Sequence, residues 1–87
     1  MSERRLREVG KVTHYFTRIG VAVIELTDKL SVGDKILIKG STTNIEQTIE
    51  SMQIEHENVK TAQRGQSIGL KVNDRVREED RVYKIVL

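Results

Sequence analysis

Glycine is the only strong punctuation in this sequence of 87 residues, and it falls at positions 10, 20, 33, 40, 65 and 69. Between the glycines lie short runs rich in Val, Ile and Leu, residue types that favour strands. Five of these runs read as strands, or as a turn leading into a strand: Val9–Phe16, Val21–Leu26, Leu30–Gly40, Ser67–Val72 and Arg81–Leu87. Short strands at intervals of about ten residues are typical of an all-β barrel.

The segment Thr43–Asn58 fits two structures. Ile45, Ile49 and Met52 are spaced like one face of a helix, and a capping-box pattern precedes them. As a strand, the same segment changes parity after Ile49, and a β-bulge near Glu50–Ser51 would restore the alternation. Periodicity alone does not decide between the two, but a strand here completes a set of six.

We therefore predict one all-β domain, a closed six-stranded antiparallel barrel over residues 9–87, because a chain this short cannot fill two cores. Less than a tenth of the residues should be helical. The predicted core consists of the apolar faces of the strands: Val12, Val23, Ile36, Ile38, Ile49, Met52, Ile68, Leu70, Val82 and Ile85.

The residue types exclude several classes of chemistry. Cysteine is absent, which rules out disulfides and thiolate metal sites. His14 and His56 are the only histidines, too few for a convincing nucleophile with its base and orienting group. Glu55–Glu57 is a poor metal site because neighbouring side chains on a strand point to opposite faces. No phosphate-binding glycine motif occurs. We expect no enzyme activity, no metal, no cofactor and no bound nucleotide.

Charge and hydropathy give expectations about location and partners. The net charge is only +2, and no apolar run approaches the ~20 residues that span a bilayer. Met1–Gly10 is charged where a signal peptide would be apolar, so we predict a cytoplasmic protein without membrane contact. About one residue in three is charged and neither Cys nor Pro occurs, a composition compatible with a thermophile.

Basic residues gather near the start of the chain. Arg4, Arg5 and Arg7, followed by Lys11, suggest a flexible basic arm over residues 1–8. Two interpretations stay open: a solubilising arm, or an arm that contacts phosphates and becomes ordered on RNA.

Three segments carry a resemblance to a known family. In Leu30–Gly40, a Gly-Asp turn leads into a strand of alternating apolar residues. In Ile49–His56, two apolar residues flank a pair made of one charged and one small residue. Ala62–Val72 matches an Ala-x-x-Gly-x-x-hydrophobic-Gly pattern. In this order they resemble the β-barrel second domain of translation elongation and initiation GTPases. The resemblance implies a Greek-key barrel of the translation-protein type.

The resemblance also implies a function. In that family the barrel holds the acceptor end of tRNA, which makes His56, Arg64 and Ser67 candidate RNA contacts beside the basic arm, although Glu55 rather than His56 aligns with the family's histidine. The main hypothesis is a non-catalytic binding module for tRNA or the ribosome. The alternative is an accessory protein–protein interaction domain, since a similar barrel is appended to collagenase-type peptidases.

Overall fold

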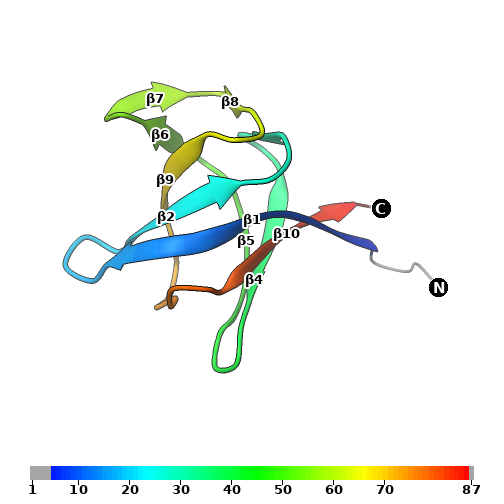
Figure 1. Ribbon diagram of the computed structural model, residues 1–87, viewed down its shortest axis with the longest axis vertical. Helices are drawn as coiled ribbons and strands as arrows, with labels where there is room; N and C mark the ends of the chain where they lie inside the picture. Colours follow the sequence, from blue (N-terminus) through cyan, green and yellow to red (C-terminus); the bar gives the residue numbers. More distant parts are fainter. Residues whose placement is uncertain (1–4, 87) are drawn as a thin grey trace.

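The computed structural model describes residues 5–86, which form ten strands joined by turns and contain no helix (Figure 1). The strands are β1 (Arg5–Phe16), β2 (Val21–Leu26), β3 (Leu30–Ser31), β4 (Lys35–Lys39), β5 (Asn44–Thr48), β6 (Met52–Ile54), β7 (Glu57–Val59), β8 (Thr61–Ala62), β9 (Ser67–Lys71) and β10 (Arg81–Val86).

Eight of the strands form one antiparallel sheet in the order β5-β4-β10-β1-β2-β9-β6-β7, and β3 pairs with β8 separately. The sheet curls around a single core. In Figure 1, β1 and β2 cross the middle of the molecule, β6 and β7 lie at the top, and the hairpin of β4 and β5 extends to the bottom. Arg5 lies opposite Val86, so the ends of the described chain are neighbours.

The longest strand, β1, bends because two residues are inserted into its ladders. Val9 has no partner in β10, and Thr13 has none in β2. Such bulges increase local twist and let one strand serve two neighbours at different angles. The bulged Val9 is fully buried, and its carbonyl oxygen accepts a hydrogen bond from the Thr27 amide at 2.8 Å.

The core confirms most of the predicted interior. Eight of the ten predicted side chains are buried, whereas Val23 and Ile85 are only partly buried. Val23 points away from the core, because the residues of β2 that face the core are Ala22, Ile24 and Leu26. Val21 and Val23 consequently lie on the outer face of the sheet.

The all-β prediction is confirmed, and the segment 44–59 forms strands and not a helix. The predicted closed six-stranded barrel is not confirmed, because the hydrogen-bonded sheet is open and the described chain has ten strands. β5 pairs with β4, and β6 pairs with β9, so residues 49–51 join the two sides of the opening covalently. Ile49 holds this link in place through two backbone hydrogen bonds. Its amide donates to the Asp34 carbonyl at 2.9 Å, and its carbonyl accepts from the Gly33 amide at 2.8 Å.

Residues 5–8 of the predicted basic arm form the first part of β1 and pair with β10. Arg4 and the rest of that arm lie outside the described residues. Within residues 5–86, no helix has the length and apolar character required to cross a membrane.

Candidate functional site

A groove on the outer face of the sheet is the best candidate site. Its main pocket, of ≈ 400 Å³, lies between the β1–β2 turn and the tip of the β6–β7 hairpin, and is lined by Phe16, Ile19, Val21, Val23, Gln53, Glu55, His56, Ser67, Ile68 and Gly69. A second pocket of ≈ 210 Å³ shares Val21, Gln53 and Gly69 with the first and continues to Ser51, Met52 and Lys71. The two pockets together form what we call the β9 groove.

The floor of the β9 groove is a glycine. Gly69 pairs with Val23 of β2 on one side and with Gln53 of β6 on the other. A Cβ at Gly69 would meet only Val21 Cγ1 at 3.6 Å and Gln53 O at 3.9 Å, which are ordinary contacts. Packing therefore does not require a glycine at position 69. The main consequence of the glycine is that the outer face stays open between the neighbouring side chains.

One wall of the groove is apolar. Phe16 and Ile19, at the β1–β2 turn, are 46% and 61% exposed, beside the outward-facing Val21 and Val23. The Phe16 ring is held edge-on by His14, with ring centroids 4.4 Å apart. Large apolar side chains gathered next to a hollow are a feature of binding surfaces.

The opposite wall is polar and strained. Glu55 and His56 form the two-residue tip of the β6–β7 hairpin, with φ of 50° and 67°. Both signs match a type I′ turn, which strongly prefers Asn-Gly because other side chains are strained at positive φ. Among the described residues, the side chains of His56 and Ser67 have no hydrogen-bond partner.

The structure brings together only two of the predicted site residues. His56 and Ser67 both line the β9 groove, whereas Arg64 lies in the exposed turn before β9 and does not line it. The apolar wall was not predicted as part of a site. The available signal was that β2 is apolar on both faces at its start, which places unburied valines on the outside.

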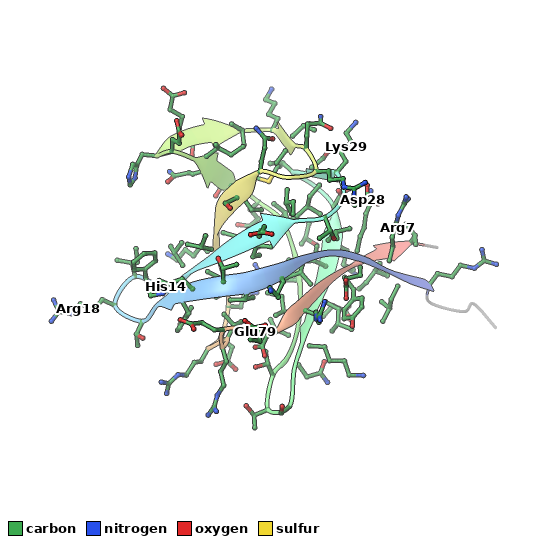
Figure 2. All side chains as sticks on the ribbon, in the orientation of Figure 1. Arg7, His14, Arg18, Asp28, Lys29 and Glu79 are labelled. Carbon is green, nitrogen blue, oxygen red and sulfur yellow. The ribbon has the colours of Figure 1, made fainter. Side chains whose placement is uncertain are left out.

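Two basic residues of β1 form ion pairs away from the groove. Arg7 Nε lies 2.7 Å from Asp28 Oδ2, and Lys11 Nζ lies 3.6 Å from Glu79 Oε2. Figure 2 shows Arg7 beside Asp28 near one end of β1, far from Arg18 in the turn at the other end. The described basic residues of the predicted arm therefore do not line the groove. No group of three or more potential metal-ligating His, Asp or Glu side chains occurs within residues 5–86.

The comparisons with known proteins point away from translation factors. No family model matches the sequence. The chain is 46% identical over 83 residues to an uncharacterized protease of Methanocaldococcus jannaschii, covering 94% of this chain and 20% of that protein. It is 40% identical over 83 residues to a collagenase of Porphyromonas gingivalis, covering 93% of this chain and 23% of that protein. The chain thus spans about a fifth of the length of these relatives.

A solved structure supplies the fold. The C-terminal domain of a Geobacillus thermoleovorans protein assigned to the U32 peptidases superposes with a TM-score of 0.84 at 22% identity, covering 90% of this chain and 91% of that domain. The chain has the fold of a U32 peptidase C-terminal domain.

This finding corrects the family resemblance. The relatives are peptidase and collagenase proteins and the structural neighbour is a peptidase domain, so the assignment to translation-factor barrels is wrong. The prediction of an elongation-factor-like RNA-binding protein is therefore also wrong. The three motifs that suggested it describe turns and alternating strands, which unrelated β-domains share for the same backbone reasons.

Proposed function

We propose that this chain is a non-catalytic accessory domain that binds protein in the service of a U32-type peptidase. The observation that carries the proposal is the pattern of similarity: the match covers nearly all of this chain but about a fifth of each relative. Most of the sequence of those relatives lies outside the matched segment, and the proposal assigns catalysis to that larger part.

The arrangement of the histidines supports a non-catalytic role. His14 Nδ1 lies 3.5 Å from Glu78 Oε1 and its ring packs on Phe16, so it is turned toward structural neighbours. His56 shares the groove with Ser67, but no hydrogen bond joins these two side chains in the described chain. A serine nucleophile needs a base within hydrogen-bond reach.

The decisive experiment uses the M. jannaschii relative without its matching 83 residues. Calorimetry should detect binding of this chain to that truncated protein in the micromolar range, as expected for a modest inter-domain interface. The chain alone should release no peptides from casein or gelatin. Release of peptides by the purified chain would make it an enzyme, and failure to bind the truncated protein would remove the accessory role.

A pair of variants locates the interface. Ile19→Asp puts a charge on the apolar wall and should weaken binding at least ~10-fold, the effect expected for a side chain at the centre of an interface. Asn44→Asp adds the same charge on the exposed edge strand β5, away from the groove, and should leave binding unchanged.

A further inference from the structure

We propose that the β9 groove binds an extended peptide segment in which a large apolar side chain lies between an acidic and a basic residue. The inference rests on the proposed protein-binding function and specifies what the groove accepts. Three features of the groove carry it: an apolar wall, polar groups without partners, and ends of opposite charge.

The apolar wall favours a ligand that inserts a large apolar side chain, here called the anchor. Phe16 and Ile19 remain largely exposed, while Gly69 leaves the floor between Val23 and Gln53 without a side chain. A hollow of ≈ 400 Å³ lies in the range of known ligand pockets, about 300–1,000 Å³, and is roomy enough for one large side chain. Burying such a side chain against this wall removes apolar surface of both partners from water.

The polar wall indicates that the occupant has a hydrogen-bonding backbone. His56 and Ser67 present a ring nitrogen and a hydroxyl that have no partner among the described residues. The hairpin holds Glu55 and His56 at positive φ, a strained conformation of the kind found at ligand-binding sites. A peptide offers amide N–H and C=O groups to these side chains while its anchor contacts the opposite wall.

The two ends of the groove differ in charge. Lys71 lines one end, Glu55 lines the other, and Glu25 lies beside that second end because it pairs with Ser67. Within residues 5–86 these three side chains form no ion pair, so their charges are available to a ligand. Lys71 lies four positions after Ser67, a span of about 13 Å on a strand. An extended peptide with its charges four residues apart matches this span.

The same charges disfavour a nucleic acid. Binding to a phosphate backbone depends on clustered cations that release counterions. The β9 groove presents one lysine at one end and two carboxylates near the other. Phosphates that follow the groove would meet Glu25 and Glu55.

The test is a titration of the ¹⁵N-labelled chain with blocked pentapeptides, followed by amide chemical shifts. The probe Asp-Gly-Phe-Gly-Lys should shift the amides of Val23, His56, Ser67 and Gly69 with a Kd on the order of 1 mM, as expected for so small a ligand. The amides of β4 and β5 should not shift. Replacing Phe by Ser in the probe, or both charged residues by Ser, should weaken binding several-fold.

Two variants test the floor and the charged end separately. Gly69→Val raises a side chain from a floor that has room for its Cβ, and should abolish the shifts while the melting temperature is retained. Asn44→Val is the matched control on β5 and should bind as the unmodified chain does. Lys71→Glu makes both ends acidic, so the preferred probe should change from Asp-Gly-Phe-Gly-Lys to Lys-Gly-Phe-Gly-Lys.

Several results would overturn the proposal. One is the absence of groove shifts with every probe at about 5 mM, five times the expected Kd. Another is a dependence of groove shifts on protein concentration without peptide, which would identify a second copy as the occupant. A third is stronger binding of oligouridine in the groove. If peptides fail while the truncated M. jannaschii relative still binds, the accessory function stands and only this inference falls.

Discussion

Glu55 and His56 are held in a backbone conformation that neither residue prefers. The hairpin between β6 and β7 leaves two loop residues, and both have positive φ. Asn and Gly adopt this turn with less strain. We therefore predict that Glu55→Asn combined with His56→Gly stabilises the domain by about 1 kcal/mol, which raises the melting temperature by roughly 4–8 °C. Thermal unfolding followed by circular dichroism measures the change.

The same double variant separates stability from function. The two replacements take the acidic and imidazole groups from the wall of the β9 groove, so peptide binding should fall as stability rises. An unchanged or lower melting temperature would show that the two side chains relieve the strain through contacts in the folded chain.

Glu79 is a third non-glycine residue at positive φ, at 76°, in the turn that precedes β10. The Asp80 amide donates to the Arg77 carbonyl across this turn, at 3.2 Å. We predict that Glu79→Gly stabilises the domain by about 0.5–1 kcal/mol. Glycine adopts this positive φ without strain, and the strain relieved exceeds the small contribution of the exposed ion pair with Lys11. Glu79→Ala is the control, since it removes the same carboxylate but keeps Cβ. If both variants melt alike, backbone strain is not the cause.

At the scale of elements, the end of β4 is fitted to the turn before β10. The carboxylate of Asp80 is buried, accepts a hydrogen bond from the Arg77 amide at 2.8 Å, and occupies the space where a Cβ at Gly40 would lie. Gly40→Ala should therefore destabilise the domain by about 1–3 kcal/mol through displacement of a buried, hydrogen-bonded group. Gly69→Ala is the matched control and should change stability by less than about 0.5 kcal/mol, because its Cβ meets only ordinary contacts. Urea unfolding of both variants measures the difference.

The elements differ in how well the sequence predicted them. Val21–Leu26 was assigned correctly because a glycine precedes it and its residues favour strands. β3, β7 and β8 were missed, since strands of two or three residues carry no periodic signal. β3 and β8 also depend on each other, and they lie far apart in the chain. Ile45, Ile49 and Met52 are all buried, as either interpretation required. The strand ends at Thr48 and the next begins at Met52, and this interruption lets residues with helix-like spacing all face the core of a β-structure.

The candidate site was less predictable than the fold. Gly69 and the β2 valines could be seen in the sequence, but their meeting with the β6–β7 hairpin depends on pairings across the sheet. His56 and Ser67 were chosen for a resemblance that proved wrong, yet both line the groove. Their position follows from register and turn geometry, which local patterns do not determine.

At the scale of the whole molecule, one covalent link spans the opening of the sheet. Residues 49–51 join β5 to β6, and no ladder connects these two strands within the described chain. Apart from that link, Gln47 reaches across the opening: its side chain donates to the Lys71 carbonyl and accepts from the Asn73 amide, at 3.0 and 2.9 Å. Stability should therefore depend strongly on where the chain is opened.

Two circular permutants test this dependence, because Arg5 lies opposite Val86 and a short Gly-Ser linker can join them. A chain opened between Ser41 and Thr42 keeps all five residue pairs between β4 and β5, and should melt within a few degrees of a linker-matched parent. A chain opened between Glu50 and Ser51 loses the only covalent tie across the opening, and should be less stable by at least ~2 kcal/mol, the scale of a lost long-range loop constraint. Equal stability of the two permutants would mean that core packing and the hydrogen bonds of Gln47 hold β5 beside β6 without the covalent link.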